Sequence, residues 1–151
     1  MNILRGRSRA HSGQAIAEIA LAVPVLFLLM AGAIDVGRYA QFQIKVANSA
    51  RAAVQYGSLN LATAADTTGM KNAAVNDAPS TISASMVTPS NYCACSNAVG
   101  TAVQCTPTAC SSTHRLLFVT ATVSATFKPL FNYPLVSSTT VSRTAISQVS
   151  Q

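Results

Sequence analysis

Residues 12–57 read SGQAIAEIALAVPVLFLLMAGAIDVGRYAQFQIKVANSARAAVQYG, and this stretch decides the fold. Its central part, residues 19–34, is a run of sixteen uncharged and mostly apolar residues. A helix that spans a bilayer needs ~20 such residues, and ~17 is close to the short limit. Extending the run back to Gln14 gives 21 residues but includes Glu18. A carboxylate costs ~2.5–3.5 kcal/mol at the centre of a membrane helix and less near its end, so Glu18 calls for a reason.

The second part of the stretch, residues 35–57, has the 3.6-residue period of an amphipathic helix. The apolar or small residues of one face are Val36, Tyr39, Phe42, Val46, Ala50 and Ala53. Because Gly57 is a natural stop, we expect one helix from about Gln14 to Tyr56. Its first half suits lipid, and its second half should carry a small domain. Pro24 lacks a backbone N–H and is expected to kink this helix or to melt a turn.

Three basic residues precede the apolar run, at Arg5, Arg7 and Arg9. They leave three interpretations of the N-terminus. The run could be a plain membrane anchor with a cytoplasmic N-terminus, by the positive-inside rule. It could be a secretory signal that is cut after the A-x-A-like sequence ending at Ala33. It could also be a prepilin-type signal, in which the basic leader ends at Gly13 and the cut falls between Gly13 and Gln14, before the apolar helix.

The prepilin-type interpretation gives Glu18 a role. Cleavage after Gly13 would make Glu18 the fifth residue of the mature chain and would create an α-amino group at Gln14. A carboxylate in this position can pair with the same amine of a neighbouring subunit. Because an unpaired buried charge is expensive, such a pair favours one defined stagger between subunits. Gly13 and Gln14 are therefore the candidate cleavage site, and Glu18 is the candidate charge partner.

The composition argues against an enzyme and against a nucleic-acid-binding protein. Only 9% of the 151 residues are charged, against a usual ~25%. The four acids are separated in sequence, the histidines number two, and no phosphate-binding or nucleophile motif occurs. Beyond the leader, the basic residues are spread singly, whereas nucleic-acid binding needs a concentrated patch. We expect no catalytic residue, no cofactor, no metal and no nucleic-acid partner.

The part beyond residue 57 is rich in Ala, Thr and Ser and reads as a small domain with strands. Leu116–Phe127 alternates strictly and predicts the clearest strand, with Thr139–Val149 as its antiparallel neighbour. Ile82–Thr88 predicts a weaker strand, and Met70–Asp77 a short helix. The expected fold class is α+β, in which a long hydrophobic-then-amphipathic helix carries a small antiparallel sheet domain. The expected divisions are a leader at 1–13, the helix at 14–57 and an exported domain at 58–151.

Four cysteines lie within 18 residues, at Cys93, Cys95, Cys105 and Cys110. Their spacing does not match the paired C-x2-C pattern of zinc sites. An exported domain enters an oxidising space, where such clusters form disulfides, so we expect two structural bridges rather than a metal site or free thiols. Three connectivities are possible. The nested one, Cys93–Cys110 with Cys95–Cys105, would close a hairpin around Gly100.

These features together resemble the TadE-like family, the pilin-like proteins of bacterial tight-adherence (Tad/Flp) pilus systems. The first matching stretch, residues 12–57, has a Gly after a basic leader, a Glu near the start of the apolar run, a Pro within it, an acid-x-Gly-Arg step and an Ala-Arg-rich helix. Here these are Gly13, Glu18, Pro24, Asp35-Val36-Gly37-Arg38 and Ala50-Arg51-Ala52-Ala53. A second stretch, the four cysteines followed by Phe127-Lys128-Pro129-Leu130-Phe131, also looks like the family. This sequence departs from the pattern at Ile19, where an aromatic residue is common, and at Asp35, where Glu is usual.

The resemblance implies a minor pilin or pseudopilin that is cut by a prepilin peptidase between Gly13 and Gln14. The implied partners are that peptidase, other pilins or pseudopilins, the inner-membrane assembly platform and the lipid bilayer. The implied location is the bacterial inner membrane, with a cytoplasmic N-terminus and a periplasmic domain, or an extracellular pilus. The alternative is a secreted, disulfide-bridged adhesive domain that signal peptidase releases after Ala33.

Overall fold

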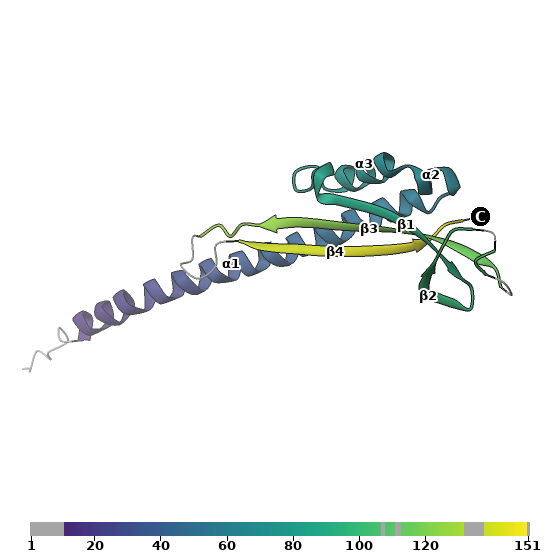
Figure 1. Ribbon diagram of the computed structural model, residues 1–151. Helices are drawn as coiled ribbons and strands as arrows, with labels where there is room; N and C mark the ends of the chain where they lie inside the picture. Colours follow the sequence, from purple (N-terminus) through teal and green to yellow (C-terminus); the bar gives the residue numbers. More distant parts are fainter. Residues whose placement is uncertain (1–10, 107, 111–112, 132–137, 151) are drawn as a thin grey trace, which may run out of the picture. The chain divides into compact units, whose positions relative to one another are not determined.

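The computed structural model describes residues 11–106, 108–110, 113–131 and 138–150. The chain forms two compact units, one up to Arg38 and one from Tyr39 onward. The predicted fold class is confirmed: a long N-terminal apolar helix is followed by a four-stranded antiparallel sheet and two disulfides (Figure 1).

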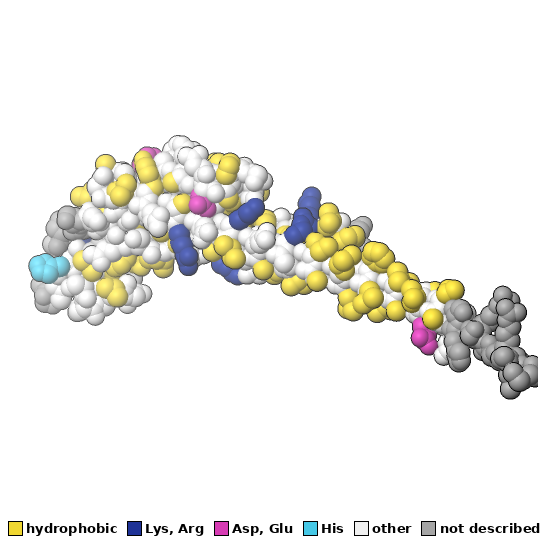
Figure 2. Space-filling view, turned by 180° about the vertical axis from the view of Figure 1, so that it is seen from behind, with side chains coloured by type: hydrophobic (Ala, Val, Ile, Leu, Met, Phe, Trp, Pro, Cys, Tyr) yellow, Lys and Arg dark blue, Asp and Glu magenta, His cyan; other side chains and the backbone are white. Residues whose placement is uncertain are grey.

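The first helix, α1 (His11–Gly57), is continuous over its 47 residues and confirms the long helix predicted from Gln14 to Tyr56. It contains Pro24 without interruption, so no turn melts there, and a kink at Pro24 stays a prediction. The side chains of its apolar first half are exposed and cover the helix surface (Figure 2), among them Leu21 at 77% and Leu28 at 73%. By length and composition, α1 is able to cross a membrane.

The sheet of the second unit has the order β2-β1-β3-β4, with every neighbouring pair antiparallel. Its strands are β1 (Val87–Cys95), β2 (Ala98–Val103), β3 (Arg115–Phe127) and β4 (Thr139–Gln148). The predicted pairing of the last two strands is confirmed, and they lie side by side in Figure 1. The predicted faces of β3 are also confirmed, because Val119, Ala121 and Val123 are fully buried while the alternate residues are partly or largely exposed.

The buried face of the sheet packs into one core with the second half of α1 and with α3 (Thr67–Asp77). Helix α1 contributes its predicted apolar stripe, in which Val46, Ala50 and Ala53 are at most 1% exposed. Val36 departs from the prediction and is 69% exposed, because it precedes Tyr39, where the second unit begins. Burial contributes ~1.5–3 kcal/mol for a valine and about 0.8 kcal/mol for a single carbon such as the methyl group of alanine, so this stripe stabilises the packing of the second half of α1 in the core.

The two ends of the sheet are fixed by separate contacts to α1 and to the residue that follows it. At one end, the ring of Phe127 lies 5.3 Å from the ring of Tyr39 and 5.5 Å from that of Phe42, measured between centroids. At the other end, the Ser150 N–H donates to the carbonyl of Ser58 over 2.9 Å. Strand β3 therefore runs from the C-terminal end of α1 back toward Tyr39.

Several local predictions were wrong. The strand expected at Ile82–Thr88 begins only at Val87, after a 3₁₀ turn η1 (Ala84–Met86), and continues to Cys95. Helix α3 begins three residues earlier than predicted, and neither the short helix α2 (Leu61–Ala65) nor strand β2 was predicted. Pro89 is tolerated in β1 because β2 pairs only with Cys93–Cys95, which leaves the earlier part of β1 at the sheet edge.

Candidate functional site

The predicted cleavage site and charge partner lie on the first turns of α1. Gln14 and Glu18 are exposed and separated by one helical turn, and the Gln14 side-chain amide donates to a Glu18 carboxylate oxygen over 3.3 Å. Gly13 is exposed, and a Cβ atom built on it would meet no atom within 4 Å. Glycine costs ~1 kcal/mol relative to alanine inside a helix, so this turn is less stable than one with alanine at the same position.

Glu18 lies among exposed apolar side chains. Ile16 is 68% exposed and Ile19 is 61% exposed, and the apolar run follows directly. Further along, Val23, Leu26, Phe27 and Met30 line an open apolar groove of about 220 Å³ beside Pro24. Because many exposed apolar side chains are unfavourable in water, this part of α1 is suited to lipid or to packing against other helices.

An ion pair follows the end of the apolar run. The Arg38 guanidinium donates to the Asp35 carboxylate over 2.9 Å, and Asp35 is only 6% exposed. Both residues belong to the acid-x-Gly-Arg step, for which no contact was predicted. Their i,i+3 spacing on a helix was the available signal, since such residues are neighbours on the helix surface.

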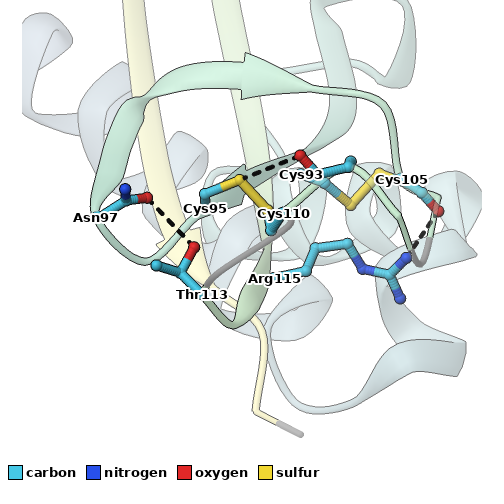
Figure 3. Close-up of a disulfide and its surroundings, with 8 residues drawn as sticks. Cys93, Cys95, Asn97, Cys105, Cys110, Thr113 and Arg115 are labelled. Carbon is cyan, nitrogen blue, oxygen red and sulfur yellow. Dashed lines mark hydrogen bonds between the residues drawn. A yellow bond between two sulfur atoms is a disulfide. The ribbon is translucent and has the colours of Figure 1, made fainter.

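The two expected disulfides are present, but the nested connectivity was wrong. The bridges are Cys93–Cys105, with Cα atoms 5.2 Å apart, and Cys95–Cys110, with Cα atoms 5.6 Å apart. They cross in sequence and lie side by side at the β1–β2 end of the sheet (Figure 3). All four thiols are consumed, so they are not available to a metal, and the described residues hold no cluster of three His, Cys, Asp or Glu side chains that could bind one.

The strand register explains this connectivity. The β1–β2 hairpin turns at Ser96 and Asn97, since Cys95 pairs with Ala98, rather than around Gly100 as the nested pairing required. Cys93 pairs with Val103 near the end of β2. Cys105 comes two residues after Val103, so it lies closer to Cys93 than to Cys95. The chain then reverses, and the Ala109 carbonyl oxygen lies 3.7 Å from the Cys95 sulfur, which brings Cys110 to Cys95.

A hydrogen-bond cluster that was not predicted from the sequence lies at the C-terminal end of α1. The Tyr56 hydroxyl donates to the Asp66 carboxylate over 2.8 Å, and the same carboxylate caps α3 by accepting from the Gly69 N–H over 2.8 Å. A Cβ atom at Gly69 would collide with Asp66 and with the Tyr56 ring. The N-cap position of Asp66 before a helical segment was the available sequence signal, whereas the tyrosine partner required the tertiary structure.

This cluster shifts two pKa values in opposite directions. The hydrogen bond from the Gly69 N–H, followed by that from Tyr56, lowers the pKa of Asp66 below its ordinary 3.8. The hydrogen bond to Asp66, together with burial, raises the pKa of Tyr56 above its ordinary 10.0. Since Asp66 is ionised more easily in the folded state, its contribution to stability is complete above its unfolded pKa and is lost as the pH falls through its folded pKa.

We therefore predict that acid removes the stabilisation contributed by Asp66. Asp66→Asn retains a good helix cap but has no titratable carboxylate, so it is the matched control. The midpoint of thermal unfolding should be higher for the parent than for Asp66→Asn at neutral pH, and this difference should shrink as the pH falls below 3.8. A difference that is unchanged between neutral and acidic pH would contradict the assignment of this carboxylate.

The comparisons with known proteins concern the N-terminal segment. A family model described as TadE-like protein matches residues 13–55 and confirms the resemblance for the long helix. The match begins at Gly13 and ends before the cysteines, so the resemblance of the C-terminal stretch stays a prediction. No curated protein and no solved structure matched the chain. The family match indicates a protein that is associated with the Tad pilus, and this family is one of structural, pilin-like proteins rather than enzymes.

Proposed function

We propose that this protein is a minor pilin or pseudopilin of a tight-adherence pilus, which is made with a leader and matured by a prepilin peptidase. The observation that carries the proposal is the order of features along α1. A basic leader, Gly13, Glu18 and an apolar helix follow one another within the segment that the TadE-like family model matches. The protein takes part in assembly or adherence and carries out no chemistry.

Before assembly, α1 anchors the precursor in the bacterial inner membrane. The apolar run supports a single crossing, and the three arginines of the leader support a cytoplasmic N-terminus. The domain that follows is then periplasmic, where the oxidising environment supports both disulfides. Its partners are the prepilin peptidase, the assembly platform and other pilins or pseudopilins.

After cleavage, Glu18 and the new amine of Gln14 act between subunits. On α1 the Gln14 amide already reaches Glu18, which supports the idea that a group at this position lies within range of the carboxylate. In an assembled pilus the amine of one subunit meets Glu18 of the next. Such a pair in an apolar environment stabilises one axial register over others, because any other register leaves both charges unpaired.

The rival function is a secreted adhesive domain that signal peptidase releases after Ala33. Two observations favour cleavage at Gly13 instead. The family match extends from residue 13 to residue 55 and includes Ala33 well inside it. Helix α1 also passes through Ala33 and continues into the core of the second unit.

Replacement of Gly13 tests the proposed processing. Gly13→Leu should leave the leader attached, because a peptidase that recognises the glycine at the cleavage site cannot accept a branched side chain there. Mass spectrometry of the membrane-bound protein should then give the mass of the full chain, and the variant should be missing from sheared pili. Gly32→Leu, which lies inside the apolar run, is the matched control and should be processed normally. Normal processing of Gly13→Leu would contradict the proposal.

A further inference from the structure

An exposed apolar pair follows strand β3. Leu130 is 63% exposed and Phe131 is 43% exposed, and they directly follow Lys128 and Pro129. We call Lys128–Phe131 the KPLF segment. Two large apolar side chains that are exposed next to each other form a candidate contact surface, because contiguous apolar patches on soluble domains mark interaction sites.

The position of the KPLF segment within the second unit indicates what it contacts. It begins one residue after Phe127, whose ring packs on Tyr39 and Phe42. Tyr39 is the first residue of the unit and lies only five residues after Ile34, the last residue of the apolar run. Five helical residues rise by ~7.5 Å, which is about the thickness of one headgroup layer.

The chemistry of the KPLF segment suits a phospholipid surface. Leucine and phenylalanine are the residues that insert at the boundary between headgroups and acyl chains, to a depth of ~5–10 Å. The exposed Lys128 adds a positive charge that is attracted to phosphate, and the segment contains no acid. Two apolar side chains bind a membrane weakly by themselves. When a helix already tethers them, however, the contact becomes intramolecular and requires little affinity.

We propose that the KPLF segment contacts the headgroup region of the outer leaflet of the membrane in which α1 is anchored. This contact would hold the domain against the bilayer before the subunit is extracted into a pilus. The inference rests on the proposed membrane anchoring of α1 and adds to it a second, reversible membrane contact made by the globular domain.

The chain contains no tryptophan, so a single introduced tryptophan reports its own position without background. The full chain with Phe131→Trp is reconstituted in phospholipid vesicles whose acyl chains carry bromine either near the headgroups or near the bilayer centre. Bromine quenches tryptophan emission only at close range. We expect strong loss of tryptophan emission with the shallow bromines and weak loss with the deep ones. The emission maximum in vesicles should also be shifted to the blue relative to that of the unfolded protein in denaturant. Leu130→Trp is a second reporter in case the first variant folds poorly.

Leu59→Trp is the matched control, because Leu59 is also 63% exposed in the same unit. It follows Ser58 at the other end of the sheet, and the 13 residues of β3 span ~40 Å. Its emission should be unaffected by either bromine position. Phe27→Trp, inside the apolar run, tests the anchoring itself and should be quenched by the deep bromines.

The outcomes distinguish failure of the membrane anchoring of α1 from failure of the membrane contact of the KPLF segment. If Phe27→Trp is not quenched, the membrane anchoring fails. If Phe27→Trp is quenched and both KPLF reporters are not, only the membrane contact of the domain is overturned. A blue shift of Phe131→Trp that grows with protein concentration and occurs without bromine quenching would assign the segment to a second copy of the chain, and would also overturn the inference.

Replacement of Lys128 tests the proposed role of its charge independently. In vesicles that contain an anionic phospholipid, adding Lys128→Ser to Phe131→Trp should lower the equilibrium constant for the membrane contact about fivefold. In vesicles of neutral lipid the same substitution should have little effect. An equal effect in both lipids would contradict the proposed role of the charge.

Discussion

Glu18→Ala is expected to leave cleavage after Gly13 intact and to reduce incorporation into pili by at least a factor of about one hundred. The expected size follows from the ~3–5 kcal/mol that is lost when one partner of a buried charge pair is removed. In the variant, the amine of Gln14 would enter an apolar helix bundle without a partner. The measurement is the ratio of this subunit to the major pilin in sheared pili, determined by quantitative mass spectrometry.

Two control variants separate charge from shape. Glu18→Gln keeps the size of the side chain and its ability to accept a hydrogen bond from Gln14 but removes the charge, so it should fail like Glu18→Ala. Glu18→Asp keeps the charge on a shorter side chain and should restore part of the incorporation. Normal incorporation of Glu18→Gln would show that the carboxylate charge has no role in assembly.

Loss of either disulfide is the second large effect that we expect. A bridge that closes a loop of about 15 residues contributes ~3 kcal/mol, and both bridges here close loops of this size, with sequence separations of 12 and 15. For a domain of this length, that loss lowers the midpoint of thermal unfolding by ~10–20 °C. Circular dichroism of Cys95→Ser/Cys110→Ser should show this decrease, and a change below ~3 °C would contradict it.

Thiol counting on double variants tests the crossed connectivity. Cys93→Ser/Cys105→Ser removes one complete bridge, so the folded protein should retain Cys95–Cys110 and show no free thiol. Cys93→Ser/Cys110→Ser breaks both bridges and should leave two thiols, unless these form a new bridge between Cys95 and Cys105. Peptide mapping of the parent under non-reducing conditions decides that point directly. Recovery of Cys93 linked to Cys110 would contradict the structure.

The parts of the fold that were predictable are those in which burial imposes a strict period. The alternation of Leu116–Phe127 matches the two faces of β3, and the stripe through Val46, Ala50 and Ala53 matches the buried face of α1. In both elements one face meets the core and the other does not, so the pattern of residues follows the geometry of the element. Strand β1 has no such pattern, because its first half is mostly polar and lies at the sheet edge. It forms a strand because it pairs with β3 along its whole length, and not because its residues favour strands.

The missed features of the candidate sites depend on contacts between elements. The crossed disulfides follow from a hairpin turn at Ser96 and Asn97 and from a register shift between Ala94 and Cys95, and neither is encoded in the cysteine spacing. The bond from Tyr56 to Asp66 joins two helices, so no single periodic pattern contains it. By contrast, the hypothesis for Gly13 and Glu18 needs no contact between elements, because both residues belong to one continuous helix and their spacing alone carries it. Their roles stay predictions.

The most direct test of the central claim is the N-terminal sequence of the mature protein from the membrane fraction of cells with an active prepilin peptidase. Processing after Gly13 predicts that the chain begins at Gln14, with Glu18 as its fifth residue. A chain that begins at Ile34 would contradict the account and establish release by signal peptidase. An intact Met1 in such cells would also contradict it, because α1 would then be a plain anchor without the amine that Glu18 is proposed to bind.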